Sequence, residues 1–409
     1  MNMLISTHHC VQVLAILYVR MLLHFPKGFF WGAASASYQV EGGIDTTDWA
    51  YEARATGRVP VADSGPDHYN RYEEDFDLAR SIGHNAHRMS IEWARIEPAP
   101  GEFSQDAIRH YRKVIKAMKA RGLTPFVTLW HFTLPKWLYV EGGAASPLFP
   151  EYFARYASYV AGELGPDVEH WVTMNEPVVF ASCGWLRGQW PPFKRGHFFQ
   201  MLKVLKHLAQ AHNVAYQRIK DKDLAVEVGI VKNNIYFHAN AAPHNKLAAY
   251  LMTWFWNRFF LRKVKNNIDT IGLNYYFHKK FGDTGVYIKN DMGWDLFPEG
   301  IYHVLCDLKQ YGKPIFVAEA GIADELDVHR GSYIENLLYW VHRAIDDGVP
   351  VKGFMYWSLT DNFEWALGYE KRFGLIAIDY KTKKRTVRPS ALVYKKICEA
   401  NALDVTTRH

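Results

Sequence analysis

Residues 168–177 read Val-Glu-His-Trp-Val-Thr-Met-Asn-Glu-Pro, and residues 313–321 read Lys-Pro-Ile-Phe-Val-Ala-Glu-Ala-Gly. In each stretch a run of β-branched and aromatic residues, typical of a strand, leads to a glutamate, Glu176 or Glu319. A proline or a glycine follows within two residues and ends the strand. Both glutamates are therefore expected at the C-terminal ends of strands.

Runs of this kind recur along the chain and alternate with amphipathic helical patterns. The eight expected strands cover residues 32–38, 85–91, 125–129, 169–174, 227–231, 270–273, 314–317 and 351–356. The expected helices include residues 106–121, 150–164, 200–220, 301–311 and 333–347, with a last helix, 389–402, on the outside. Repeated strand–helix units predict an α/β fold with a parallel sheet. Eight units in one chain favour a closed (β/α)8 TIM barrel over an open doubly wound sheet.

The length of 409 residues fits one barrel domain, which spans roughly 200 to over 400 residues. We assign residues 25–405 to this domain and residues 1–24 to an N-terminal extension of uncertain structure. An apolar segment, Val11 to Leu23, is shorter than the ~20 residues that cross a bilayer, and Arg20 interrupts it. It lacks the basic start and the small-residue cleavage site of a signal peptide. We expect a cytoplasmic protein without a membrane partner and with Met21 as its natural start; secretion or membrane association through this segment is the alternative.

Charge and cysteine usage exclude several other classes. The net charge of +6 comes from lysines and arginines interspersed with acids, and the main basic run, residues 380–385, is expected to be a solvated turn rather than a nucleic-acid site. Cys10, Cys183, Cys306 and Cys398 lie far apart, without metal-ligand spacing or a disulfide framework. We therefore expect no metal, no cofactor and no nucleic-acid partner.

Polar and aromatic residues collect just after nearly every expected strand, which a structural core alone would not require. They are Gln39, Arg88, His131, Asn175, Glu176, Asn274, Tyr276, Glu319 and Trp357, followed by the loop residues Glu364 and Trp365. Barrel enzymes build their sites at this end of the strands. Two carboxyl groups that face each other there have the arrangement that glycosidic bond cleavage requires.

Five motifs in this order resemble glycoside hydrolase family 1, the β-glucosidase and β-galactosidase family. They are residues 25–42, Phe-Pro-Lys-Gly-Phe-Phe-Trp-Gly-Ala-Ala-Ser-Ala-Ser-Tyr-Gln-Val-Glu-Gly; residues 87–93, His-Arg-Met-Ser-Ile-Glu-Trp; residues 173–177; residues 273–276, Leu-Asn-Tyr-Tyr; and residues 357–366, Trp-Ser-Leu-Thr-Asp-Asn-Phe-Glu-Trp-Ala. The resemblance runs from Phe25 to Leu403. It implies a retaining double displacement in which Glu176 is the general acid and base and Glu319 the nucleophile.

The resemblance also assigns supporting residues. Arg88 would supply positive charge beside Glu319, and Tyr276 would offer its hydroxyl to the nucleophile, because alternate side chains of a strand place Asn274 and Tyr276 on one face. Asn175 would bind the sugar 2-hydroxyl. Neighbouring residues of a regular strand cannot both point inward, so we expect a bulge or a strand end at Asn175 and Glu176.

The glycone pocket implied by the resemblance consists of Gln39, His131, Glu364 and Trp365, with Trp357 as the stacking floor. Phospho-β-glycosidases bind a 6-phosphate near the loop that carries Glu364, and a carboxylate there would repel it. The expected function is therefore a retaining exo-β-glycosidase that hydrolyses unphosphorylated β-D-glucosides, and also β-galactosides and β-fucosides.

Two departures from the family pattern accompany this expectation. Ala318 and Ala320 flank Glu319, where family members usually read Thr-Glu-Asn-Gly, and the segments 43–67 and 234–274 are shorter than usual. A transglycosylase on the same site and a sugar-binding pseudoenzyme remain the alternatives; thioglucosidase chemistry is disfavoured because residue 176 is Glu rather than Gln. The oligomeric state stays open.

Overall fold

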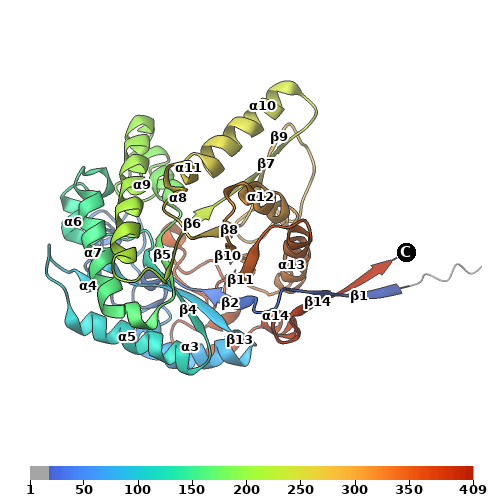
Figure 1. Cartoon of the computed structure of the whole chain (residues 1–409), viewed down its shortest axis with the longest axis horizontal. Helices are drawn as coiled ribbons and strands as arrows, with labels where there is room; N and C mark the ends of the chain where they lie inside the picture. The colour runs from blue at the N-terminus through green and yellow to red at the C-terminus, as the bar shows by residue number, and fades with distance from the viewer. Residues whose placement is uncertain (1–17, 409) are drawn as a thin grey trace, which may run out of the picture.

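Eight parallel strands close into a barrel in the computed structural model, which describes residues 18–408 (Figure 1). In chain order these strands are β2 (Phe30–Ala34), β3 (Ala86–Ser90), β4 (Thr124–Trp130), β5 (His170–Asn175), β6 (Glu227–Asn233), β8 (Thr270–Tyr275), β10 (Ile315–Ala320) and β11 (Val351–Trp357). The last of them, β11, pairs in parallel with the first, β2, and so closes the ring. The predicted (β/α)8 barrel is confirmed.

Helices cover the outside of the barrel. The main ones are α3 (His68–Ser81), α5 (Gln105–Ala120), α7 (Phe149–Leu164), α9 (Phe198–Lys220), α12 (Gly300–Leu308), α13 (Arg330–Asp346) and α14 (Pro389–Ala400). Further helices lie in the loops: α1 (Ser37–Val40), α2 (Asp48–Thr56), α4 (Trp93–Ile96), α6 (Lys136–Val140), α8 (Pro177–Ala181), α10 (Pro243–Met252) and α11 (Leu261–Val264). The side chain of Ser104 caps the N-terminus of α5. The buried residues of this helix include Ile108, Ile115 and Met118, whose helical spacing places them on the one face that packs against the strands.

The barrel interior is filled at its N-terminal end. The rings of Phe126 and Phe316 lie 5.0 Å apart there, and Phe126 stacks on His170 at 4.3 Å. Ala86 and Met355 complete this cluster. Because close-packed side chains occupy that end, a ligand can enter only from the C-terminal ends of the strands.

The first strand was expected at residues 32–38, and this position is wrong. The strand is Phe30–Ala34, and the chain then turns into the buried helix α1. The backbone N–H of Ser37 donates to the Ser90 hydroxyl at 2.7 Å, which holds this turn over the end of β3. The alanines and serines of residues 33–37 lack the β-branched side chains that mark a strand, so their alternation carries no strand signal.

The seven residues Tyr18–His24, at the end of the expected extension, form β1. This strand pairs antiparallel with β14 (Ala402–Arg408) in a two-stranded ribbon that extends away from the barrel (Figure 1). The rest of the apolar segment that begins at Val11 lies outside the described residues. Within residues 18–408, no helix is long and apolar enough to cross a membrane.

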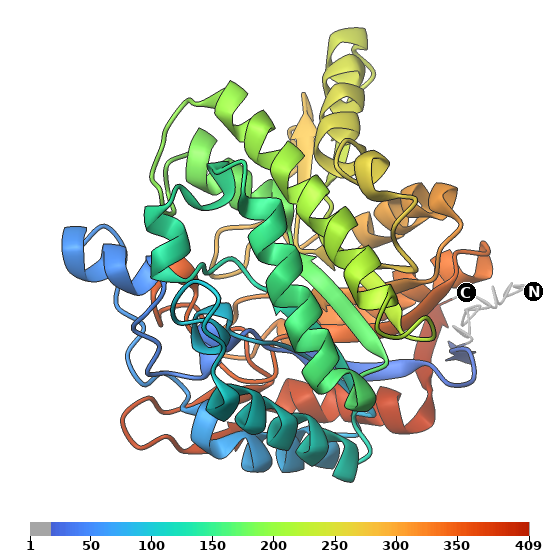
Figure 2. The ribbon, with the colours of Figure 1, turned by 60° about the vertical axis from the view of Figure 1, so that its left-hand side comes forward.

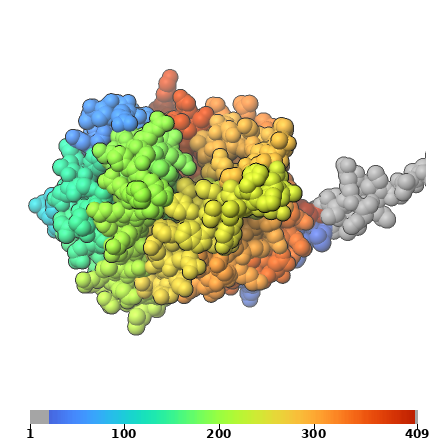
Figure 3. Space-filling model, turned by 90° about the horizontal axis from the view of Figure 1, so that it is seen from above, coloured from blue at the N-terminus to red at the C-terminus, as the bar shows by residue number. Residues whose placement is uncertain are grey.

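A second ribbon, this one parallel, consists of β7 (Tyr236–Ala239) and β9 (His278–Phe281) and continues outward from the ends of β6 and β8. Helix α10 follows β7 and projects from the body of the molecule (Figure 2). In the space-filling view this yellow segment lies between the green segment that contains α9 and the orange segment beyond β9 (Figure 3). A small hairpin, β12 (Ile376–Ile378) and β13 (Arg385–Val387), precedes α14.

Candidate active site

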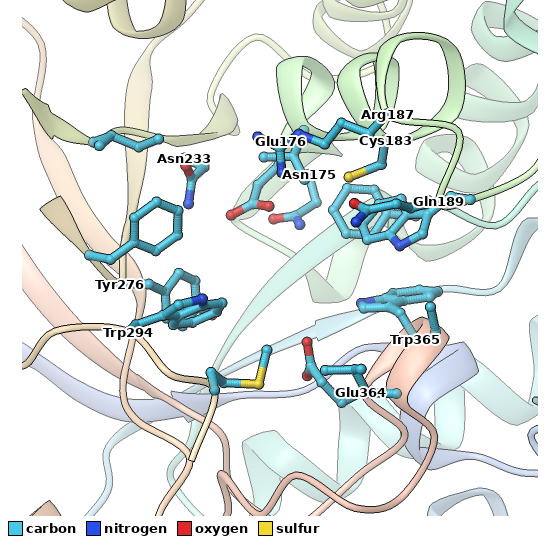
Figure 4. Close-up of a pocket in the computed structure, with 18 of the residues that line it drawn as sticks. Asn175, Glu176, Cys183, Arg187, Gln189, Asn233, Tyr276, Trp294, Glu364 and Trp365 are labelled. Atoms are coloured by element: carbon cyan, nitrogen blue, oxygen red, sulfur yellow. The ribbon is translucent and has the colours of Figure 1, made fainter. Parts of the chain in front are cut away.

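A cavity of about 1010 Å³ opens at the C-terminal ends of the barrel strands. Nine of the residues expected in the site line it: Gln39, His131, Asn175, Glu176, Tyr276, Glu319, Trp357, Glu364 and Trp365. The remaining two, Arg88 and Asn274, are buried directly behind this lining and hydrogen-bond to it. Figure 4 shows Glu176 and Asn175 on one side of the cavity, with Glu364 and Trp365 opposite.

A continuous set of hydrogen bonds joins the two predicted catalytic carboxyl groups. Nδ2 of Asn274 donates to Oε1 of Glu176 at 2.7 Å and to Oδ1 of Asn175 at 3.3 Å. The same Asn175 oxygen accepts from Nη2 of Arg88 at 2.8 Å, and Nη1 of Arg88 pairs with Oε1 of Glu319. Each carboxyl group is therefore fixed relative to the other through three side chains from three different strands.

The hydroxyl of Tyr276 donates to the other oxygen of Glu319, Oε2, at 2.6 Å. The neighbouring Tyr275 points away from the cavity, where its hydroxyl donates to the Phe297 carbonyl at 2.6 Å. The alternation of side chains along a strand thus places Tyr276, as expected, rather than Tyr275 beside Glu319.

Glu176 lies at the junction of β5 and α8. Its backbone has φ 44° and ψ 58°, a left-handed conformation that is uncommon for a residue other than glycine. Its N–H donates to the Val231 carbonyl at 2.9 Å, and the register between β5 and β6 shifts between Val172 and Asn175. The expected strand end is confirmed, and the turn lets adjacent Asn175 and Glu176 both face the cavity.

Burial and the negative charge of Glu319 raise the pKa of Glu176 to about 8, against opposing contributions from Asn274, Lys232 and Arg88. Burial, together with the charges of Glu319 and Glu176, also raises the pKa of Glu364 to about 8. Near neutral pH both groups therefore hold their protons in the free enzyme. Glu176 is thus a buried carboxyl group that stays protonated, whereas Glu319 is paired with an arginine. These are the two states that a general acid and a nucleophile require.

Several polar atoms around the cavity have no hydrogen-bond partner among the described residues: Oε1 of Gln39, Nδ1 of His131 and Oδ1 of Asn274. Gln39 is anchored by its Nε2, which donates to the Asn362 side chain at 3.0 Å and to the Phe363 carbonyl at 2.8 Å. Its remaining oxygen can accept from a ligand hydroxyl. Buried polar groups in this state favour a hydroxylated ligand that completes their hydrogen bonds.

The tautomer of His131 follows from its neighbours. Because Oδ1 of Asn175 accepts from Arg88, its Nδ2 is a donor, and it lies 3.2 Å from Nε2 of His131. Burial and the positive charge of Arg88 hold the pKa of His131 well below its ordinary value, so the ring is neutral. Nε2 must then accept, and Nδ1 carries the hydrogen that can be donated to a ligand.

Trp357, at the end of β11, and Trp365 flank His131, with ring centroids 6.0 and 6.1 Å from the imidazole. Trp365 has φ 49° and follows Glu364, whose backbone N–H donates to the Gly368 carbonyl at 2.6 Å. This turn presents Glu364 and Trp365 to the cavity from the loop beyond β11.

The residues that flank Glu319 are turned away from the two carboxyl groups. Ala318 packs with Val172 and Val231 in a small apolar cluster inside the barrel, and Ala320 belongs to the layer between strands and helices. The contacts of Glu319 come from Arg88 and Tyr276 instead.

The sequence analysis missed Asn233, which lines the cavity at the end of β6 and accepts from the Trp256 indole at 3.3 Å. Its signal was available, because polar residues at or just after strand ends marked most of the other site positions. The fifth strand was ended at residue 231, whereas β6 continues to Asn233. Trp294 and Arg187, which also line the cavity, stand in loops without a motif.

An eight-stranded α/β barrel with two buried carboxyl groups in one cavity is the architecture of a barrel glycoside hydrolase. The model of glycosyl hydrolase family 1 matches residues 21–268 and 276–403. Beta-glucosidase A of Thermotoga maritima is 33% identical over 93% of this chain and 99% of its own length, and a beta-galactosidase of Pyrococcus woesei is 31% identical over 93% and 98%. The solved beta-glucosidase from Thermotoga maritima in complex with glucoimidazole superposes with a TM-score of 0.88 at 31% identity, covering 92% of this chain and 99% of that one. The chain belongs to glycosyl hydrolase family 1, and it is a β-glycosidase of that family.

Proposed function

We propose that this enzyme is a retaining exo-β-glycosidase that acts on unphosphorylated β-D-glucosides, and also on β-D-galactosides and β-D-fucosides. The observation that carries the proposal is the connection of Glu176 to Glu319 through Asn274, Asn175 and Arg88 at the closed end of one cavity. Relatives named as beta-glucosidase and as beta-galactosidase support the two main substrate classes.

In the first step Glu319 attacks the anomeric carbon while Glu176 gives its proton to the departing glycosidic oxygen. The carboxylate of Glu319 becomes an ester, and the aglycone leaves as an alcohol. The raised pKa of Glu176, about 8, supports its role as the acid, because the group is protonated at neutral pH before the reaction.

In the second step water attacks the same carbon, Glu176 removes a proton from the water, and the ester bond breaks, which restores the carboxylate of Glu319 and releases the sugar. Ester formation has by then neutralised Glu319, whose negative charge is one cause of the raised pKa of Glu176. The pKa of Glu176 therefore falls in the intermediate, and the group becomes a base at the time when a base is needed. Arg88 and Tyr276 position the Glu319 carboxylate before the ester forms and after it is hydrolysed.

The glycone would be held by the atoms that lack partners in the free site. Oε1 of Gln39 and the carboxyl group of Glu364 would accept from sugar hydroxyls, and Nδ1–H of His131 would donate to one. Asn175 would bind the 2-hydroxyl beside the two carboxyl groups, while the ring of Trp357 offers an apolar face to the sugar C–H groups. A cavity closed at one end by these residues favours removal of a terminal sugar.

The decisive experiment is proton NMR of the first anomer released from 4-nitrophenyl β-D-glucoside. Release of the β-anomer before mutarotation is expected for a retaining enzyme. Release of the α-anomer would overturn the double displacement. Complete consumption into glycosylated acceptor, with no free glucose, would identify the transglycosylase alternative, and no consumption of any aryl β-glycoside would identify a sugar-binding protein.

A further inference from the structure

The outer part of the cavity carries positive charge that no described residue neutralises. Arg58, Arg187 and Lys279 line it, and none of the three forms an ion pair with a carboxylate in residues 18–408. A fourth cation, Lys280, is balanced by Asp295 at 3.6 Å. The carboxyl groups that line the cavity are those of Glu176, Glu319 and Glu364, which belong to the catalytic and glycone region.

Each of these three cations lies near an aromatic ring of the cavity wall. The guanidinium carbon of Arg58 is 4.0 Å from the ring centre of Phe193, and that of Arg187 is 5.8 Å from the ring centre of Trp256. Nζ of Lys279 lies 5.5 Å from the ring centre of Phe277. The wall therefore presents aromatic surface and positive charge side by side.

Arg187 is the cation closest in sequence to the predicted acid. It follows the π-helical turn Ser182–Leu186, which continues α8 beyond Glu176. Burial raises the pKa of the Cys183 thiol, which lies within this turn, and the positive charge of Arg187 opposes that rise. Figure 4 shows Arg187 and Glu176 on the same side of the cavity. A leaving group that receives its proton from Glu176 would thus lie within the field of Arg187.

The catalytic end of the cavity does little to offset this charge. Glu319 is already paired with Arg88, and Glu176 and Glu364 retain their protons near neutral pH. An anionic group that enters the outer cavity would therefore meet a net attraction, which salt would weaken because Arg58, Arg187 and Lys279 are exposed.

We propose that the aglycone site selects an aromatic aglycone that bears a carboxylate. The inference rests on the proposed hydrolysis of β-glucosides and specifies the leaving-group side of the same cavity. The aromatic body of the aglycone packs against the wall formed by Phe193, Trp256 and Phe277, and its carboxylate binds Arg187, with Arg58 and Lys279 adding to the attraction.

The test compares 3-carboxyphenyl and 3-carbamoylphenyl β-D-glucosides, which have similar shapes and differ in charge. The measured quantity is the ratio of their kcat/KM values, in the wild type and in the variants Arg187→Gln, Arg58→Gln and Lys279→Gln. The difference in leaving-group ability is common to all four proteins and cancels. We expect Arg187→Gln to lower the ratio at least ~5-fold, and the other two variants to lower it by smaller factors.

Arg187→Lys keeps the charge and should retain most of the wild-type ratio, and Lys113→Gln, on the exposed face of α5, should leave it unchanged. Raising the salt concentration from about 0.02 M to about 0.5 M should lower the wild-type ratio toward that of Arg187→Gln. An unchanged ratio in all three cavity variants would overturn the inference. If neither glucoside is hydrolysed while another aryl β-glycoside is, the glucoside preference fails instead, and the same ratio is measured on that glycone.

Discussion

Tyr276 donates a hydrogen bond of 2.6 Å to Oε2 of Glu319. Asn274, two residues earlier and near the end of β8, donates one of 2.7 Å to Oε1 of Glu176. Because Tyr276 directly follows β8, the end of this single strand fixes where both carboxyl groups stand. A change in β8 should therefore disturb the acid and the nucleophile together.

Glu319→Gly should abolish hydrolysis of aryl β-glucosides without unfolding the protein, because the group that forms the covalent intermediate is removed. Added azide should restore turnover by attacking the opposite face of the sugar, and the product should be the α-glucosyl azide. The product is identified by NMR, and circular dichroism checks the fold. Hydrolysis at the wild-type rate in Glu319→Gln would remove this residue from the mechanism.

Glu176→Ala should slow the release of poor leaving groups far more than the release of dinitrophenol, since an activated phenolate departs without a proton. Pre-steady-state rates of glycosylation with a series of aryl β-glucosides measure this dependence. We expect the loss to be at least ~100-fold larger for phenyl than for dinitrophenyl glucoside, about 2.7 kcal/mol. Equal losses across the series would show that Glu176 is not the acid.

The wild-type enzyme should prefer 4-nitrophenyl β-D-glucoside over its 6-phosphate by at least ~100-fold in kcat/KM. Burial is the main cause of the raised pKa of Glu364, and the charge of Glu319 adds to it, so a phosphate brought to that place meets the same desolvation cost and the same repulsion from Glu319. Glu364→Ala should lower kcat/KM for the glucoside, and it should lower the ratio of this kcat/KM to that for the 6-phosphate. Comparable rates on the two substrates in the wild type would contradict the assignment of Glu364 to a neutral sugar.

The pH profile of kcat/KM should fall on the alkaline side near pH 8, where Glu176 loses its proton in the free enzyme. Steady-state assays between about pH 5 and about pH 9.5 with phenyl β-glucoside test this limb. Dinitrophenyl glucoside, which needs no acid, serves as the control and should show a weaker decline.

Glu364 should make a contribution to the stability of the free enzyme that decreases as the pH rises from about 5 to about 8. Glu364 has a folded pKa raised above its ordinary value of 4.5, so in this range the folded state binds more protons than the unfolded state, and unfolding becomes easier with rising pH. Glu364→Gln removes this contribution, so the free energy of unfolding of the variant should change less with pH than that of the wild type, by up to about 4 kcal/mol across the range. The exposed Glu102→Gln variant is the control and should follow the wild type.

Much of the site could be predicted because barrel strands place their last side chains in one cleft. The runs before Glu176 and Glu319 contain Val, Ile, Phe and Trp, so their strands and the polar residues that follow them stood out. The first strand was misplaced for the opposite reason, since residues 33–37 are alanines and serines that suit a turn as well as a strand. Gln39 was nevertheless expected in the site, because it follows even the misplaced strand and also stands in the family motif.

Other features depend on contacts between distant segments. The donor form of His131 follows only from the orientation of Asn175, which Arg88 determines from another strand. The positive charge of the outer cavity joins Arg58, Arg187 and Lys279 from three separate loops or ribbons. No local pattern marks such residues, because their spacing in the sequence reflects loop lengths rather than helical or strand periodicity.

The ribbon of β1 and β14 can form only at the end of synthesis, because its two strands come from opposite ends of the chain. Leu23 pairs with Leu403, so β1 leaves the ribosome long before its partner exists. At 5–20 residues per second, this delay lasts roughly 20 to 80 s. During that time an apolar strand with two open edges is exposed to other chains, and such edges invite intermolecular pairing. We therefore expect this protein to be more prone to aggregate during its synthesis, while β1 is unpaired, than after the barrel and the ribbon have formed.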